Sequence, residues 1–131
     1  MALILGSWKI NIDGFEDVLE IQSVSADGRV EGRLFNSPCH GFWNEAAQEL
    51  VLCHALVVDS LAGLGAEVAV LRGHLFGTPR EPPPGQDVMW TLAGLLQVTP
   101  PFTPTQKLGT KFSGTNRRNE FGWFAQLNQV I

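Results

Sequence analysis

Gly6-Ser7-Trp8-Lys9-Ile10-Asn11-Ile12 is the stretch of the chain that most clearly predicts its fold. Apolar side chains at Trp8, Ile10 and Ile12 alternate with polar ones, which is the two-residue period of a β-strand with one buried face. A large indole that enters a core at the start of a short, turn-rich chain indicates a first strand around which later strands close. The segment therefore favours an antiparallel β-barrel.

Seven further segments have the composition of short strands separated by turn residues. They are predicted at 15–25, 29–35, 40–44, 50–58, 67–76, 86–99 and 120–129, with a loop at 59–66. Ala26-Asp27-Gly28 and Glu45 to Gln48 predict hairpin turns. Eight strands without a crossover or a long helix predict an all-β, eight-stranded antiparallel up-and-down β-barrel, in which the last strand pairs with the first. A two-sheet β-sandwich is the alternative, and it would keep Trp8 and Trp123 far apart.

Length and charge limit the classes of function. A chain of 131 residues matches one domain, 1–131, which can bury a core without disulfides or metals. The net charge of -4 provides no basic field, so we expect no nucleic-acid partner and no binding to an anionic membrane. The apolar opening 1–5 is too short for a signal peptide, which predicts a cytoplasmic protein.

Seven of the eight prolines lie in two predicted connections, 78–85 and 99–119. Proline cannot donate a hydrogen bond to a strand ladder, so this distribution spares the central strands. We expect the segment 100–119 to act as a lid over one open end of the barrel.

Four short motifs resemble the avidin and streptavidin family: Gly6-Ser7-Trp8, then 26–32 (ADGRVEG), 71–76 (LRGHLF) and 89–94 (MWTLAG). Their order and spacing are similar to those of that family's barrel, and the GxW opening also occurs in lipocalins of the wider calycin group. The resemblance implies an eight-stranded barrel that holds a small molecule and associates into a homo-oligomer.

Two departures from the avidin pattern bear on the ligand. Ile10 and Leu34 stand where the family carries a polar residue and a tyrosine, and the late aspartate or asparagine that meets a ureido group has no clear match. A site for that group needs those donors and acceptors in place, so high-affinity biotin binding is not implied. Trp90 does fall where the family places a ligand-lining tryptophan.

Aromatic side chains are the candidate ligand-lining residues: Trp8, Trp43, Trp90, Trp123 and Phe35. Aromatic walls give a large contact area at a small entropy cost, which predicts a site for an apolar or aromatic small molecule, with Trp90 the first candidate. The alternative is that these rings fill the barrel or a subunit interface, because aromatics dominate the cores of small domains.

A repeated Cys-His dipeptide, Cys39-His40 and Cys53-His54, is joined later in the chain by His74. If the hairpins set Cys39 opposite Cys53 and His54 opposite His74, the three histidines share one face. They would then bind zinc or a similar ion and leave an open position. A shift of one residue in the first hairpin would instead set Cys39 opposite His54 and place His40 on the other face.

Three hypotheses about function follow. The first is a small-molecule-binding barrel without catalytic residues or cofactor, since no serine lies in a nucleophile elbow and no carboxylates form a pair. The second is a metal-dependent enzyme that uses His40, His54 and His74. The third is an assembly protein, because 50–58 is apolar on both faces and favours a homo-oligomer interface.

Overall fold

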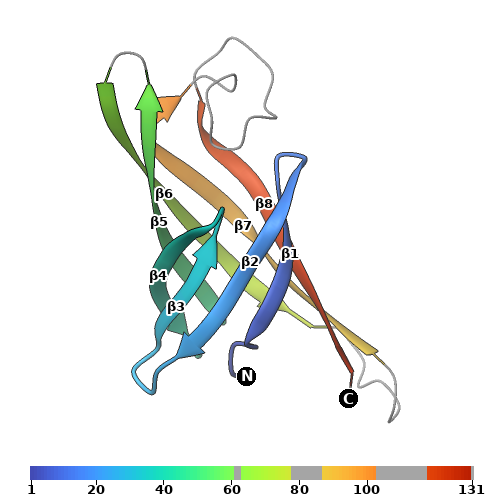
Figure 1. The fold of residues 1–131 in the computed structure, drawn as a ribbon. Helices are drawn as coiled ribbons and strands as arrows, with labels where there is room; N and C mark the ends of the chain where they lie inside the picture. Colours follow the sequence, from blue (N-terminus) through green and yellow to red (C-terminus); the bar gives the residue numbers. More distant parts are fainter. Residues whose placement is uncertain (61–62, 78–86, 103–117, 131) are drawn as a thin grey trace.

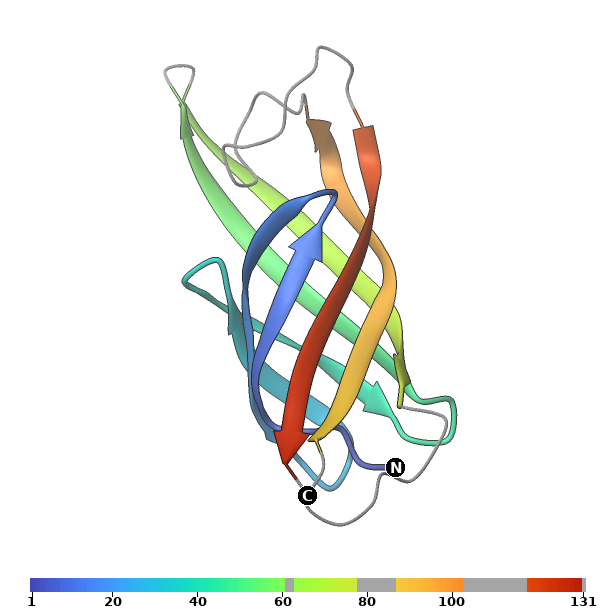
Figure 2. The same cartoon turned by 90° about the vertical axis from the view of Figure 1, so that its right-hand side faces the viewer.

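Eight antiparallel strands form one closed barrel in the computed structural model of the chain (Figures 1 and 2). The structure describes residues 1–60, 63–77, 87–102 and 118–130, and side chains over 1–55, 68–77, 88–99 and 119–129. Each strand pairs with its sequence neighbours, and β8 also pairs with β1. The strands are β1 (Gly6–Ile12), β2 (Phe15–Val24), β3 (Arg29–Leu34), β4 (Ser37–Asn44), β5 (Glu49–Ser60), β6 (Gly63–Phe76), β7 (Asp87–Phe102) and β8 (Arg118–Val130).

The pairing of β1 with β8 confirms the eight-stranded up-and-down barrel. Ile12 lies opposite Trp123 in this ladder, so the first and last strands are neighbours and the sandwich alternative is wrong. Closure pairs both strands that would otherwise be sheet edges. We call the end of the barrel that carries the β1–β2, β3–β4 and β5–β6 turns the upper end, and the end at which both termini lie the lower end (Figure 1).

The alternation in the opening segment sorts side chains to the two sides of the barrel wall. Trp8, Ile10 and Ile12 point inward and none is more than 1% exposed, whereas Lys9 faces solvent. The same alternation continues around the barrel and fills the interior with aliphatic side chains, among them Leu19, Leu34, Leu50, Leu52, Leu71, Leu92 and Leu96. Burying each such side chain contributes roughly 1.5–3 kcal/mol, which makes this interior the main source of stability.

Two turns at the upper end contain residues with left-handed backbone angles. Asp13 and Gly14 join β1 to β2 with φ values of 51° and 91°, and Phe35 and Asn36 join β3 to β4 with 52° and 59°. A two-residue type I′ turn requires positive φ at both positions, which Asp-Gly adopts readily. A bulky residue such as Phe35 is strained in this region, at a cost of about 1–2 kcal/mol.

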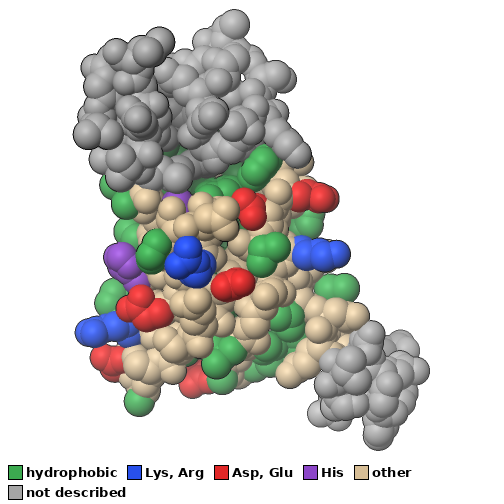
Figure 3. Space-filling model, in the orientation of Figure 1, with side chains coloured by type: hydrophobic (Ala, Val, Ile, Leu, Met, Phe, Trp, Pro, Cys, Tyr) green, Lys and Arg blue, Asp and Glu red, His purple; other side chains and the backbone are tan. Residues whose placement is uncertain are grey.

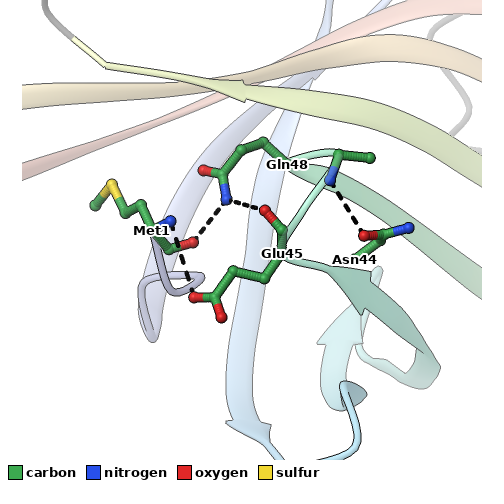
Figure 4. A network of polar contacts seen from close by, with 5 residues as sticks. Met1, Asn44, Glu45 and Gln48 are labelled. Atoms are coloured by element: carbon green, nitrogen blue, oxygen red, sulfur yellow. Dashed lines mark hydrogen bonds and ion pairs between the residues drawn. The ribbon is translucent and has the colours of Figure 1, made fainter.

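The N-terminal segment is held at the lower end of the barrel by contacts with the β4–β5 turn (Figure 4). Gln48 donates hydrogen bonds from Nε2 to the backbone carbonyls of Met1 (2.8 Å) and Glu45 (2.7 Å). The Met1 ammonium also lies 3.8 Å from a carboxylate oxygen of Glu45. Leu3 is consequently buried in the core, which places an apolar side chain across this end.

Several predicted boundaries are wrong. β4 begins at Ser37 rather than at residue 40. The predicted loop 59–66 is largely strand, because β5 and β6 stay paired as far as Ser60 opposite Gly63. β7 extends beyond residue 99, and its register with β8 shifts between Gln97 and Phe102, where a ladder tolerates proline. The predicted connection 78–85 and most of the predicted lid, 103–117, lie outside the described residues.

Candidate ligand site in the barrel interior

His54 on β5 has its side chain inside the barrel. It is the one fully buried polar or charged side chain in the part of the chain that the structure describes, with an exposed fraction of 0%. Neither Nδ1 nor Nε2 has a hydrogen-bond partner. A buried polar group without a partner costs about 1–3 kcal/mol, so His54 lowers the stability of the barrel as it stands.

Burial also determines the charge of His54. Desolvation lowers the pKa of the imidazole below its ordinary value of 6.5, and the backbone of Leu34 opposes this shift without meeting hydrogen-bond geometry. The ring is therefore neutral at pH 7. A neutral imidazole offers one N–H donor and one nitrogen acceptor.

One phenylalanine ring packs against His54 at the upper end, and a second packs against the first. The rings of Phe35 and His54 meet edge to face, with centroids 5.6 Å apart and planes at 70°. Phe15 packs on the other side of Phe35 at 5.7 Å. The three rings come from the start of β2, from the β3–β4 turn and from β5. We call Phe15, Phe35 and His54 the His54 cluster.

The predicted tryptophans line the interior, but they lie outside the His54 cluster. Trp8, Trp43 and Trp90 lie toward the lower end, where the Trp8 indole donates to the Ile4 carbonyl at 3.1 Å. Trp123 packs across β6, since a Cβ atom on Gly73 would lie 2.6 Å from its ring. The indole N–H groups of Trp43 and Trp123 have no partner. Of the five predicted ligand-lining residues, Phe35 alone belongs to the cluster.

The structure does not bring His40, His54 and His74 together. Cys39 pairs with His54 and His40 with Cys53 in the β4–β5 ladder, one residue away from the predicted register. In the β5–β6 ladder His54 pairs with Ala69 and His74 with Glu49, so the predicted pairing of His54 with His74 is wrong as well. His54 therefore points inward, whereas His40 and His74 lie on the outer surface. Within the described residues, no group of three histidine, cysteine or acidic side chains is placed to hold a metal ion. The geometry on which the metal hypothesis depended is absent.

Sequence reasoning missed Phe15, and it treated His54 only as one of three possible metal ligands. The signal for His54 is its phase, because it continues the inward series of Leu50 and Leu52 and must therefore face the core. Phe15 directly follows the Asp13-Gly14 turn and pairs with Ile12, which places it at the rim. Both positions follow once the hairpin registers are known.

Comparisons with protein families, curated proteins and solved structures give no match for this chain. The resemblance to avidins therefore rests on the short motifs and on the eight-stranded antiparallel barrel itself. No helix in the described part of the chain is long and apolar enough to cross a membrane.

Proposed function

We propose that the chain binds a neutral apolar or aromatic small molecule at the His54 cluster. The observation that carries this proposal is a fully buried histidine whose two ring nitrogens have no partner in an otherwise apolar interior. A ligand that supplies a hydrogen bond there offsets the cost of burying the imidazole, which gives affinity and orientation together.

The surroundings of the cluster favour a neutral ligand with a flat apolar body and one hydroxyl, carbonyl or amide group. Phe15 and Phe35 provide aromatic surface, and the imidazole provides one donor and one acceptor. Cys39 lies opposite His54 in the ladder, and burial raises the pKa of its thiol to about 11, so it is uncharged. A carboxylate or ammonium group would find no charge partner among these residues.

The strained position of Phe35 favours the same site. Asparagine or glycine suits the first position of a type I′ turn, yet the chain carries a phenylalanine there with φ of 52°. Strain of this kind persists where the surrounding structure gains from it, and here it sets an aromatic ring against His54. Phe35→Asn is accordingly expected to relieve the turn and to weaken ligand binding.

Paired probes test the proposal. 1-Naphthol and 1-methylnaphthalene share a ring system but differ in the hydroxyl group, and both can be titrated by quenching of tryptophan fluorescence. We expect the wild type to prefer 1-naphthol by roughly tenfold in Kd, equivalent to one hydrogen bond of about 1.4 kcal/mol. His54→Leu should abolish the preference, whereas His74→Leu, on the outer surface, should keep it. The site would be ruled out if the wild type showed no saturable binding, or if His54→Leu preferred 1-naphthol as strongly as the wild type does.

We propose in addition that the outer face of β7 and β8 joins copies of the chain into a homo-oligomer. Leu95 and Phe124 are 56% and 43% exposed. Ala93 lies opposite Phe124 and Gly122 opposite Leu95, so large apolar side chains alternate with small ones. Apolar side chains gathered on a surface in this way are typical of interfaces.

Charge introduced on this face tests the assembly. Native mass spectrometry should report an oligomer for the wild type and a monomer for Leu95→Glu and Phe124→Glu. Both variants should stay folded, because these side chains point away from the core. An oligomer that survives both changes would place the interface elsewhere. In the strand first predicted as the interface, Leu50 and Leu52 point into the core. The side chains of 56–58 lie outside the described part of the chain.

A further inference from the structure

Three side chains with the elements of thiol chemistry lie in one row on the outer surface of β3, β4 and β5. Glu31 is opposite His40, and His40 is opposite Cys53. Residues directly opposite in an antiparallel ladder hold their Cβ atoms about 4.5–5.5 Å apart. Among the described residues no hydrogen bond or ion pair joins these three side chains, so rotation of the side chains is needed to bring them into contact. Glu31 and His40 are exposed, and Cys53 is partly exposed.

A cavity of about 410 Å³ covers this row. The cavity is lined by the row Glu31, His40 and Cys53 and by the neighbouring row of outward side chains on the same three strands. That second row contains Arg29, Phe42 and Val51. Phe42 is 61% exposed and adds an aromatic face to the cavity. The cavity thus presents a thiol, an imidazole, an aromatic face and a guanidinium group. On the face shown in Figure 3, side chains of both charges are interspersed with hydrophobic ones.

We propose that Cys53 is a reactive thiol that forms mixed disulfides with small aromatic disulfides bearing a carboxylate. His40 accepts the thiol proton, and Glu31 is a positioning residue that orients the imidazole. Phe42 packs against the aromatic ring, and Arg29 binds the carboxylate. The site is separate from the His54 cluster and does not depend on ligand binding there.

The reaction is a thiol–disulfide exchange. Cys53 gives its proton to the imidazole of His40, and its thiolate attacks one sulfur of the incoming disulfide. One S–S bond forms as the other breaks, so Cys53 is oxidised and the departing aryl thiolate takes the electron pair and is reduced. The imidazole then returns its proton to water. The incoming disulfide is the oxidant, and no further reactant is needed.

Cys53 is surrounded by side chains on the outer surface of three neighbouring strands. His40 faces it from β4, with Glu31 beyond on β3. On β6 its direct partner is Val70, and Arg72 is the diagonal neighbour that pairs with Val51. Arg29 lies diagonally across the cavity.

Cys39 provides a control within the same chain. It lies in the barrel core with an exposed fraction of 0%, and burial, followed by the nearby Glu31 carboxylate, raises its pKa to about 11. The two thiols therefore differ in access, although each is paired with a histidine across the ladder.

Reaction with 5,5′-dithiobis(2-nitrobenzoate), an aromatic disulfide with carboxylates, tests the proposal. The native protein should release one equivalent of aryl thiolate quickly, and the second only after unfolding in guanidinium chloride. Cys53→Ser should remove the fast phase. His40→Gln should slow it about fivefold or more at pH 7 and remove the contribution of the imidazole from the pH–rate profile. Glu31→Asp should retain most of the rate that Glu31→Gln loses.

A neutral probe separates recognition from reactivity. Arg29→Gln should slow the carboxylate-bearing disulfide severalfold but leave the rate with 4,4′-dithiodipyridine unchanged. Circular dichroism checks that each variant is folded, which the outward direction of all these side chains favours. Equal reactivity of both thiols in the native protein, or an unchanged rate in folded His40→Gln, would overturn the assignment.

Discussion

Replacing His54 with leucine is expected to make the barrel less sensitive to acid. Burial lowers the pKa of His54 in the folded protein below the 6.5 of an ordinary histidine. The unfolded chain therefore binds more protons than the folded one below about pH 6.5, and the stability of the wild type falls as the pH drops toward the folded-state pKa. Leucine has no proton to bind, so this loss disappears in the variant.

The size of the effect follows from proton linkage at one site. If only the unfolded chain protonates this side chain, lowering the pH from 7 to 5.5 removes about 1.2 kcal/mol from the free energy of unfolding. At pH 7 the variant also loses an unpartnered buried polar group, a gain of about 1–3 kcal/mol that imperfect packing of leucine partly offsets. His54→Leu should then be at least as stable as the wild type at pH 7 and clearly more stable at pH 5.5.

Urea unfolding followed by tryptophan fluorescence at several pH values between 5.5 and 7 measures this difference. His40 and His74 are present in both proteins, so their contributions cancel in the comparison. His40→Leu is the matched control, because His40 is exposed and, unlike His74, which lies 3.5 Å from a Glu49 carboxylate oxygen, forms no ion pair among the described residues; it should keep the acid sensitivity of the wild type. Parallel stability curves for the wild type and His54→Leu would refute the reasoning, because His54 would then protonate as readily in the folded protein as in the unfolded chain.

Three further perturbations test the barrel itself. Gly94→Ala should destabilise the protein by about 2 kcal/mol or more in denaturant unfolding, because a Cβ atom there would overlap a backbone oxygen of β6. Gly122→Ala is the control and should be nearly neutral, because its Cβ would meet no atom. Leu52→Glu should prevent folding, and Val51→Glu, one residue away on the outer side, should shift the urea midpoint only slightly. Gln48→Ala should cost about 1 kcal/mol and increase proteolysis of the N-terminal segment, because two hydrogen bonds are lost.

The sequence was sufficient for the architecture because periodicity and turn chemistry are local. The alternation from Trp8 to Ile12 and the turns at Asp13-Gly14 and Ala26-Asp27-Gly28 each specify structure within a few residues. The structure confirms all three, with β2 and β3 joined through the hydrogen bond from the Gly28 amide to the Ser25 carbonyl. Closure of the barrel then follows from eight such strands in sequence.

The candidate site was harder to predict because it depends on register. A turn of four residues at Glu45 to Gln48 was predicted and is present, yet the pairing it sets differs by one residue from the one that the metal hypothesis needed. Because side chains alternate with a period of two, that single residue separates His40 from His54 by the whole thickness of the wall. Glycines at 63 and 65 likewise suggested a loop, but the ladder of β5 and β6 continues through them. Ladder pairing is a long-range property that local composition does not encode.

The duplicated Cys-His dipeptide places one cysteine inside the barrel wall and the other outside it, which can be used to measure opening of the barrel. Its two copies are antiparallel partners, so one Cys–His pair faces the core and the other faces solvent. A reagent in solution reaches Cys39 only when strands separate, and its modification rate therefore measures how often the barrel opens. Cys53 reports thiol chemistry under the same conditions. Dividing the rate at Cys39 in the native protein by the rate at Cys39 in the protein unfolded in guanidinium chloride yields the opening equilibrium of the fold.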